Sequence, residues 1–215
     1  MKNIIFIAPP SAGKGTQSDM LVEKYGYKHI STGNLFRAEI ATGSDLGIKL
    51  KEIIDQGNLI DDETTKTLLL KEFNDIETNF ILDGYPRNID QANTLEEILI
   101  DTNQTNYVAI YLDIDKQTAM ERALGRITCD SCGASYNIYY DKLKPSVDGI
   151  CDKCNSELAQ RNDDNEETFN KRFDTFLEKT KPLTDFYQNL DKLKSVKVMA
   201  EKADTFAGIE SVIND

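Results

Sequence analysis

The sequence contains no apolar run that approaches the roughly 20 residues a helix needs to cross a bilayer. Its first ten residues, MKNIIFIAPP, include only a short apolar run, and no small-residue cleavage pattern follows it. This run is too short for the core of a secretory signal, so we interpret it as a buried first strand. We therefore expect a cytoplasmic protein whose thiols stay reduced.

Positive charge is also scarce. The chain carries 25 Lys and Arg against 37 Asp and Glu, which gives a net charge of -12. This balance argues against non-specific binding to nucleic acid or to acidic membranes, because both are polyanions. An acidic protein can still bind phosphate groups if its cations are gathered locally.

Internal repeats and low-complexity tracts are absent as well, and 215 residues are enough for one well-buried domain with insertions. Apolar clusters typical of strands alternate with segments of helical spacing. Such alternation predicts an α/β fold with a mostly parallel sheet that is covered by helices on both faces. The predicted strands cover 3–7, 80–82, 107–112 and 195–199, and the predicted helices cover 14–25, 32–42, 45–56, 62–73, 89–100, 116–125, 166–190 and 204–213.

Two segments fit this alternation poorly. Residues 31–60 hold two successive helical patterns with no evident strand between them, and residues 127–160 hold all the cysteines in a short Tyr- and Gly-containing stretch that resembles an inserted module. After this module, Asp163 is predicted to cap the next helix, because Glu166 follows three residues later. Pro182 is predicted to kink or break that helix.

The stretch IAPPSAGKGT at residues 7–16 has the features of a phosphate-binding loop. Such a site needs a strand that ends in a tight loop, with backbone N–H groups pointing inward at the start of a helix. Gly13 and Gly15 allow a close approach of the backbone, and Lys14 brings a positive charge to the outer phosphates. A plain Gly/Pro turn between a strand and a helix is the alternative that this short pattern leaves open.

The loop also departs from the usual pattern G-x-x-x-x-G-K-[ST]. Ala8 stands in place of its first glycine, and a left-handed conformation at Ala8 or Ser11 would cost about 1–2 kcal/mol because each carries a Cβ. Gly15 follows the lysine and cannot give a hydroxyl to Mg²⁺, as GTPase and ATPase loops do at that position, and Thr16 comes one residue later. This argues against a switch protein that hydrolyses GTP, as does the lack of a plausible N-K-x-D motif.

Arginine is rare and unevenly distributed. Only six of the 25 basic residues are arginines, and all six fall in four short segments, whereas the lysines are scattered. Guanidinium groups bind phosphate bidentately and stack on bases, which ammonium groups do less well. Ordinary surface charges would be scattered like the lysines, so this clustering predicts that a polyanion binds where the segments meet. The six are Arg37, Arg87, Arg122, Arg126, Arg161 and Arg172.

The four cysteines form two C-x₂-C pairs, Cys129 with Cys132 and Cys151 with Cys154, separated by 18 residues. Two such knuckles predict a zinc site, and four thiolates leave no open position, so the metal would be structural. The alternatives are a pair of disulfides and an empty or redox-active thiol cluster. An iron–sulfur cluster also fits the number of ligands.

The loop and the four arginine segments together resemble the adenylate kinase family. In the family pattern G-x-P-G-x-G-K-G-T, Ala8 and Ser11 replace glycines and the remaining motif positions match. In order and spacing these matches run through nearly the whole chain, although the last 40 residues are less informative. The matching segments are ISTGNLFR (30–37), QGNLI (56–60), FILDGYPRNIDQ (80–91), ERALGR (121–126) and RNDDNEETFNKR (161–172).

The resemblance implies a fold and a division of the chain. The implied fold is a P-loop, three-layer α/β fold with a central parallel five-stranded sheet, a helical AMP-binding insertion and a small zinc-bearing lid. The implied core comprises residues 1–30, 61–126 and 161–215. Residues 31–60 would form the AMP-binding domain, and residues 127–160 the lid with the zinc site at its cysteines, as in some bacterial members of the family.

The resemblance also implies site residues. Asp83 would hold Mg²⁺ through water, and the implied catalytic residues are Lys14, Arg87, Arg126, Arg161 and Arg172. The implied ATP-binding residues are Pro10, Ser11, Ala12, Gly13, Lys14, Gly15, Thr16, Arg122, Arg126 and Lys202. The implied AMP-binding residues are Thr32, Arg37, Leu59, Ile60, Gly84, Arg87, Gln91, Arg161 and Arg172.

The activity that these residues imply is ATP + AMP = 2 ADP, with Mg²⁺ bound to ATP and structural zinc in the lid. The phosphate of AMP would attack the γ-phosphorus of ATP in line, so no general base is needed. His29, the only histidine, is therefore interpreted as a surface or packing residue. We expect a monomer that binds ATP and AMP or ADP, and neither nucleic acid nor a membrane.

Two other functions compete with this interpretation. A nucleoside monophosphate kinase acting on UMP or CMP tends to have alanine in place of Thr32 and asparagine in place of Gln91, so AMP is favoured. A non-enzymatic nucleic-acid-binding protein could use Tyr136, Tyr139 and nearby lysines of the cysteine module to stack on a strand. The negative net charge and the position of the arginines outside this module argue against it.

Overall fold

The computed structural model describes residues 1–56, 58, 60–74, 76 and 78–214. Its centre is a parallel five-stranded sheet with the strand order β2-β3-β1-β4-β8, which confirms the predicted α/β class and strand number. In the register of this sheet, Ile5 of the central strand lies opposite Leu82 on one side and Ala109 on the other. The strands are β1 (Asn3–Ile7), β2 (Lys28–Ser31), β3 (Phe80–Asp83), β4 (Tyr107–Asp113) and β8 (Leu193–Lys197).

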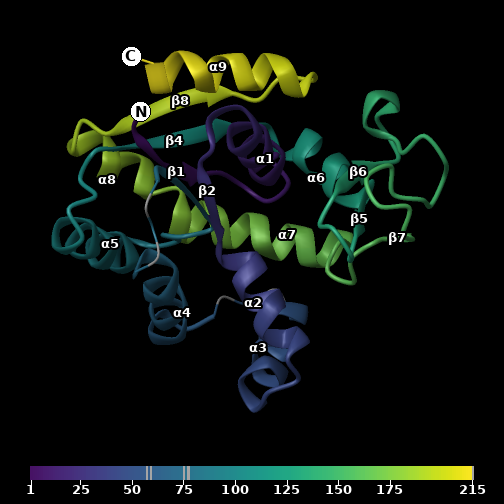
Figure 1. Ribbon diagram of the computed structural model, residues 1–215, viewed down its shortest axis with the longest axis horizontal. Coiled ribbons are helices and arrows are strands. Elements are labelled where there is room, and N and C mark those ends of the chain that lie inside the picture. Colours follow the sequence, from purple (N-terminus) through teal and green to yellow (C-terminus); the bar gives the residue numbers. More distant parts are fainter. Residues whose placement is uncertain (57, 59, 75, 77, 215) are drawn as a thin grey trace.

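Helices cover both faces of the sheet, so the molecule has three layers (Figure 1). The apolar clusters place α1 and α9 on one face and α4, α5 and α8 on the other. The helices are α1 (Lys14–Tyr25), α2 (Thr32–Ala41), α3 (Asp45–Asp55), α4 (Asp62–Asn74), α5 (Ile89–Asp101), α6 (Lys116–Leu124), α7 (Glu166–Thr175), α8 (Leu183–Asn189) and α9 (Lys202–Asn214).

Successive residues of β1 enter different cores. Ile5 is fully buried in the cluster that contains Leu95 of α5, while Ile4 is fully buried in the cluster that contains Phe206 of α9. A parallel strand buried on both faces has a continuous apolar sequence rather than an alternating one. This explains why the N-terminal run of apolar residues is a strand.

Helices α2 and α3 project away from the sheet, at the bottom of Figure 1. They share a small core that is separate from the two large ones and includes Phe36 and Leu50. The two helices approach closely at Gly47, where a Cβ would lie 2.5 Å from the carbonyl oxygen of Glu39. Glycine is therefore required at this contact, since a methyl group there would push the two backbones apart.

A second, antiparallel sheet lies to the right in Figure 1, beyond the end of α6. It consists of β5 (Arg126–Cys129), β6 (Ser135–Asn137) and β7 (Leu158–Ala159), in the order β6-β5-β7. The hydrogen bonds from Asn137 Nδ2 to the Arg122 carbonyl (2.9 Å) and from Gln160 Nε2 to the Leu124 carbonyl (3.0 Å) tie its base to the end of α6. This sheet corresponds to the segment that the sequence analysis interpreted as an inserted module.

Strand β2 is absent from the strands that apolar clustering predicted. Its sequence, KHIS, offers only Ile30 as a buried apolar residue, so pattern reasoning had little to detect. The strand forms because its backbone pairs with β3 at the edge of the sheet, from Lys28 opposite Phe80 to Ser31 opposite Asp83. Tertiary pairing here overrides weak local propensity.

The predicted cap at Asp163 is wrong. Helix α7 begins at Glu166, and the side chain of Asn165 accepts the hydrogen bond from the Thr168 N–H (2.9 Å). Asn165 is the N-cap because it directly precedes the first helical residue. The predicted break at Pro182 is confirmed: α7 passes through a π-helical stretch, Phe176–Thr180, and α8 begins at Leu183.

Among the described residues, no helix is long and apolar enough to cross a membrane.

Candidate active site

The loop between β1 and α1 leads directly into the helix at Lys14. Gly13 has a left-handed backbone, with φ 95°, and Ser11 also has a positive φ of 58°. Ser11 therefore adopts the conformation that was predicted to cost energy there, whereas Ala8 is not among the described residues with a positive φ. The Lys14 ammonium lies over this loop, 3.4 Å from the Ala8 carbonyl oxygen and 3.5 Å from that of Pro9.

Asp83 ends β3, the strand next to β1, so its carboxylate lies beside the loop. His29 Nε2 on β2 lies 3.6 Å from Asp83 Oδ2, which places the single histidine next to the predicted magnesium residue. Burial alone would raise the pKa of Asp83, but His29 and the charges of Lys14 and Arg87 outweigh burial and hold the pKa below its usual value. Asp83 is therefore ionised at neutral pH.

Two adjoining cavities of about 270 and 310 Å³ lie at this end of the sheet. Arg87 and Arg172 line the first and Arg122 lines the second, while the other three arginines line both. The six arginines, which are spread over more than half of the chain, thus surround one continuous region. The residues that line both cavities are Ser11, Lys14, Ser31, Arg37, Asp83, Arg126 and Arg161.

Two aspartates that were not predicted to contact arginines hold two of them. Arg126 binds Asp164 bidentately, with Nε 2.8 Å from Oδ2, and Arg172 Nη1 lies 2.6 Å from Asp163 Oδ2. Both carboxylates line the first cavity. The signal that could have found them is the pair of consecutive aspartates two residues after Arg161, since carboxylates orient guanidinium forks.

The cations of the site are crowded and partly removed from water. Burial, together with the nearby charges of Arg126 and Arg37, lowers the pKa of Arg161 to about 10. Burial also lowers the pKa of Lys14, although the carboxylate of Asp83 opposes this effect. A polyphosphate in the cavities would relieve the mutual repulsion of these cations, so the arrangement favours binding of a polyanion.

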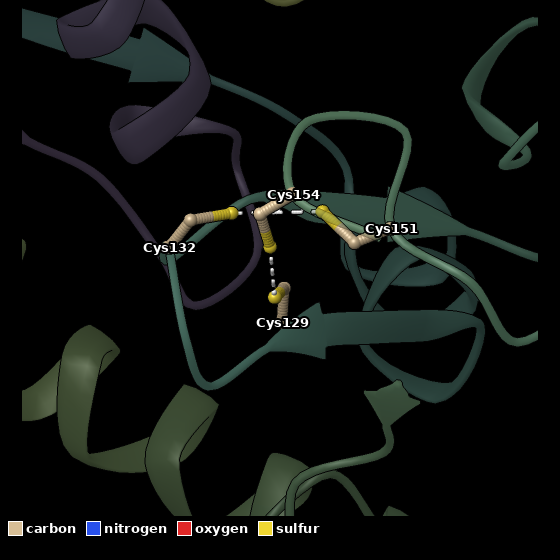
Figure 2. Close-up of side chains that lie close together, drawn as sticks. All are labelled: Cys129, Cys132, Cys151 and Cys154. Carbon is tan, nitrogen blue, oxygen red and sulfur yellow. Dashed lines mark hydrogen bonds between the residues drawn. The ribbon is translucent and has the colours of Figure 1, made fainter. Parts of the chain in front are cut away.

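The four cysteine side chains converge from two loops, as Figure 2 shows. Their sulfur atoms all lie within 4.8 Å of one another, with Cys129 and Cys154 3.4 Å apart and Cys132 and Cys151 3.5 Å apart. Disulfide sulfurs would be about 2 Å apart, whereas tetrahedral zinc with ligands at about 2.3 Å separates its sulfurs by about 3.8 Å. The cysteines are free thiols, and their spacing fits a tetrahedral metal better than disulfides.

Hydrogen-bond donors surround this cluster. The Tyr136 hydroxyl lies 3.6 Å from Cys151 Sγ and accepts a hydrogen bond from the Asp152 N–H (2.8 Å), so its own proton is free to point at the sulfur. Further N–H groups of the second knuckle also reach this sulfur, and together these donors lower the pKa of Cys151 to about 6, although burial opposes them. Donors of this kind favour the thiolate form that a metal requires.

Comparison with known proteins places this site in a family. Residues 6–192 match the sequence model described as "Adenylate kinase". The chain belongs to the adenylate kinase family. It is 40% identical over 213 residues to the adenylate kinase of Geobacillus sp. (strain WCH70) and 42% identical over 212 residues to that of Thermodesulfovibrio yellowstonii, with 98% of each chain covered. The adenylate kinase of Clostridioides difficile is 43% identical over 196 residues, which cover 90% of each chain.

The chain is therefore an ATP:AMP phosphotransferase, and it catalyses the reaction ATP + AMP = 2 ADP. Its substrates are ATP and AMP in one direction and ADP in the other. Adenylate kinases use Mg²⁺ with ATP.

Six of the nine residues predicted to bind AMP line the first cavity of this adenylate kinase. Ile60, Gly84 and Arg87 line the cavity wall, together with Arg37. Gly84 has φ 87° and lies so close to Thr32 that a Cβ would be 2.5 Å from Thr32 Oγ1, so glycine is required there. Leu59 lies outside the described residues.

Thr32 and Gln91 are buried rather than exposed to this cavity. Thr32 Oγ1 donates to the Gly84 carbonyl at 3.1 Å, and Gln91 bonds to the Arg87 N–H and to the carboxylate of Asp62. Neither side chain is among those that line the cavities. Their predicted contacts with adenine stay predictions.

The residues predicted to bind ATP line the second cavity. Ser11 to Thr16 form one wall, and Lys202 at the start of α9 forms part of another. Arg122 reaches across from α6 and donates to the Met199 carbonyl at 3.0 Å, while its guanidinium carbon lies 5.9 Å from the centre of the Tyr140 ring. The Pro10 side of the loop belongs to the first cavity.

Proposed function

We propose that this adenylate kinase transfers the phosphoryl group directly, by in-line attack of an AMP phosphate oxygen on the γ-phosphorus of ATP. The observation that carries the proposal is the gathering of Lys14 and six arginines around two adjoining cavities in an acidic protein. In such a reaction the protein supplies position and charge rather than covalent chemistry. Two cavities that meet at a cationic boundary fit two nucleotides that meet at their phosphates.

ATP is assigned to the second cavity and AMP to the first. The loop from Pro10 to Thr16 begins α1, where backbone N–H groups and the helix dipole favour the phosphates of ATP. The first cavity is bounded by α2 and the residues after β3, and Gly84, Arg87 and Arg37 are proposed to hold the AMP phosphate there. Thr32, Leu59, Ile60 and Gln91 are proposed for the adenine.

Lys14, Arg126, Arg161 and Arg172 are proposed to surround the transferred group, with Arg87 holding the acceptor phosphate. Arg126 and Arg161 line both cavities, so they lie where the two phosphate chains would meet. Arg122 and Lys202 are assigned to the donor nucleotide, because they line the second cavity. The carboxylates of Asp163 and Asp164 orient two of these forks.

Asp83 is proposed to hold Mg²⁺ through water. Its carboxylate is ionised, is buried beside Lys14 and lines both cavities. When bound there, the ion would supply positive charge that offsets the negative charge of the phosphates. His29 Nε2, on the adjacent strand, lies 3.6 Å from this carboxylate.

Zinc is proposed as the ion held by the four cysteines. The sulfur spacing supports it, and four thiolates with no open position describe a structural site rather than a catalytic one.

The location and the assembly of the protein are also proposed. Thiolates of this kind persist in a reducing compartment, so we propose a cytoplasmic location. We propose a monomer, because the sequence matches its family along nearly the whole chain. Residues 127–160 are proposed to act as a lid and residues 31–60 as the AMP-binding domain, and closure of both segments would exclude water from the transfer.

The decisive experiment is an assay of ADP formation from ATP plus AMP, with and without Mg²⁺. ADP should form only when both nucleotides and Mg²⁺ are present, in the ratio of two ADP for each AMP consumed. ADP formation from ATP without AMP would indicate hydrolysis and would contradict the proposed exclusion of water. Replacing AMP by CMP, UMP or GMP tests the rival pyrimidine kinase, and rates with UMP or CMP above the rate with AMP would favour that rival.

A further inference from the structure

The amide of Gln91 is bound at both ends by groups that can each act in only one way, either as a hydrogen-bond donor or as an acceptor. Gln91 lies in the first turn of α5 and is 4% exposed. Its Oε1 accepts the backbone N–H of Arg87 at 2.7 Å, and its Nε2 donates to Oδ1 of Asp62, at the start of α4. A backbone N–H can only donate, and an ionised carboxylate can only accept.

These partners fix which way round the amide points. A flipped amide would place Oε1 against the Asp62 carboxylate and the Nε2 protons against the Arg87 N–H. Both contacts would set like groups against each other, and the buried Gln91 amide would lose both of its partners, which is costly. The orientation therefore follows from the chemistry of the two neighbours.

One hydrogen-bonding position stays available at each end of the amide. Nε2 has a second proton to donate, and Oε1 has a second lone pair to accept with. A 6-aminopurine presents the matching pair, because its N1 accepts and its 6-amino group donates. A 6-oxopurine presents the reverse pair, with an accepting O6 and a donating N1–H, and would need the flipped amide.

We propose that Asp62 is a specificity-determining positioning residue that locks the Gln91 amide in the orientation that pairs with a 6-aminopurine and rejects a 6-oxopurine. This inference rests on the proposed assignment of the acceptor purine to Gln91. The Gln91 amide is tied to the wall of the first cavity, because its Oε1 accepts the backbone N–H of Arg87, which lines that cavity. In this proposal the acceptor base reaches the amide from that wall.

The neighbouring aspartate, Asp61, has a different role. The effect of Asp62 on the Gln91 amide can therefore be separated from an effect on the start of α4. Asp61 Oδ1 accepts the Thr64 N–H at 2.8 Å and so caps the start of α4. Capping is thus accounted for by Asp61, and the carboxylate of Asp62 is left to bind Gln91. The two residues form a matched pair for mutation.

The test compares Asp62→Asn with Asp61→Asn, using ATP as donor and either AMP or inosine 5′-monophosphate as acceptor, with the products separated by chromatography. An asparagine side chain can donate as well as accept, so Asp62→Asn releases one of the two constraints on the amide. The ratio of kcat/KM for inosine monophosphate to that for AMP should rise about tenfold in Asp62→Asn. It should stay at the wild-type value in Asp61→Asn, which keeps a capping side chain.

An unchanged acceptor ratio in Asp62→Asn would overturn the inference. If the rates with both acceptors fell equally, Asp62 would have a merely structural role, and if neither rate changed, it would have none. Asp62→Glu keeps an accepting carboxylate and should restore the wild-type ratio. If Asp62→Asn does not fold, as judged by its melting curve, Asp62→Ser removes the carboxylate with a residue that suits a helix start and undergoes the same comparison. Failure of the underlying assignment is distinguishable in Gln91→Ala: if the acceptor purine did not contact Gln91, removal of the amide would leave the acceptor ratio at the wild-type value.

Discussion

At the scale of single residues, arginine is rare in this chain, yet its side chains gather at the candidate active site. Six arginines meet at one region, and the sequence suggested this because they occur only in motif segments. Which carboxylate holds which arginine could not be predicted. The Arg126–Asp164 pair joins residues 38 positions apart and depends on the packing of α6 against α7. The orientation of the Gln91 amide was equally hidden, since it is set by Asp62 on another helix.

Replacement of Arg126 tests the proposed cluster most directly. We expect Arg126→Ala to lower kcat by about 10³-fold, by analogy with other arginines that stabilise a transferred phosphoryl group. Because Asp164 is buried and would lose its partner, Arg126→Lys should be measured alongside: it keeps a charge near Asp164 but loses the bidentate fork. Steady-state rates should fall strongly in both variants and stay normal in Lys197→Ala, an exposed site on β8. Near-normal turnover in a folded Arg126→Ala protein would rule out the assignment.

Tyr136 offers a test of the metal site without reference to activity. Removal of its hydroxyl in Tyr136→Phe should weaken zinc binding roughly tenfold, because outer hydrogen bonds orient and stabilise metal thiolates. Transfer of zinc to a coloured chelator measures the effect. Tyr139→Phe removes a hydroxyl from a mostly exposed ring in the same segment and should transfer zinc at the wild-type rate. Equal rates in the two variants would contradict a role for Tyr136.

At the scale of elements, local sequence explains most helices and strands. Capping residues mark the starts of several helices, such as Ser31, Asn88 and Asp115, because their side chains accept a backbone N–H that the helix leaves unpaired. The edge strand β2 could not be predicted, because backbone pairing with β3 rather than its own composition makes it a strand. The cap of α7 was misplaced by two residues, since Asp163 is engaged by Arg172 and Asn165 is free to bind Thr168.

The Asp163–Arg172 pair, which joins the segment before α7 to that helix, predicts a dependence of stability on pH. Burial would raise the pKa of Asp163, but the charges of Arg172 and Arg126 and the hydrogen bonds to the carboxylate together outweigh burial and lower the pKa from 3.8. A lowered pKa in the folded state means that the pair contributes stability above about pH 4, and that this contribution is lost as the pH falls through the folded-state value.

The measurement is the melting temperature of the wild-type protein and of Asp163→Asn from neutral to acidic pH. The wild-type protein should melt higher at pH 7, and the difference should shrink below about pH 4. Zinc would be lost from both proteins alike in acid, so the difference isolates the pair. A constant or growing difference as the pH falls would contradict the prediction.

At the scale of the whole molecule, the cysteine segment and the central sheet have separate cores. The cluster around Cys129 and Cys151 shares no residue with the two large clusters on either side of the sheet. A segment this small does not bury enough apolar surface to fold by itself, so a metal would supply much of its stability. The two parts of the molecule should therefore respond differently to a chelator.

Removal of zinc should loosen residues 127–160 and leave the central sheet intact. Hydrogen exchange should accelerate throughout that segment after chelation, while β1, β3 and β4 stay protected, and the melting temperature should fall. The metal content must be measured in the same sample. An unchanged melting curve in protein shown to have lost its metal would contradict structural zinc. Cys132→Ser, which removes one ligand, should reproduce the effect of chelation.

The sequence by itself determined the class of the fold, the buried strands, the phosphate-binding loop and the two cysteine knuckles. Each of these depends on residues within about ten positions of one another, whose spacing and conformational preferences act locally. The tertiary structure alone decided that the six guanidinium groups face one region, that two aspartates orient two of them, and that Asp62 holds Gln91. Those contacts join distant segments, and their geometry arises only when parallel strands bring their carboxyl ends to the same edge of the sheet.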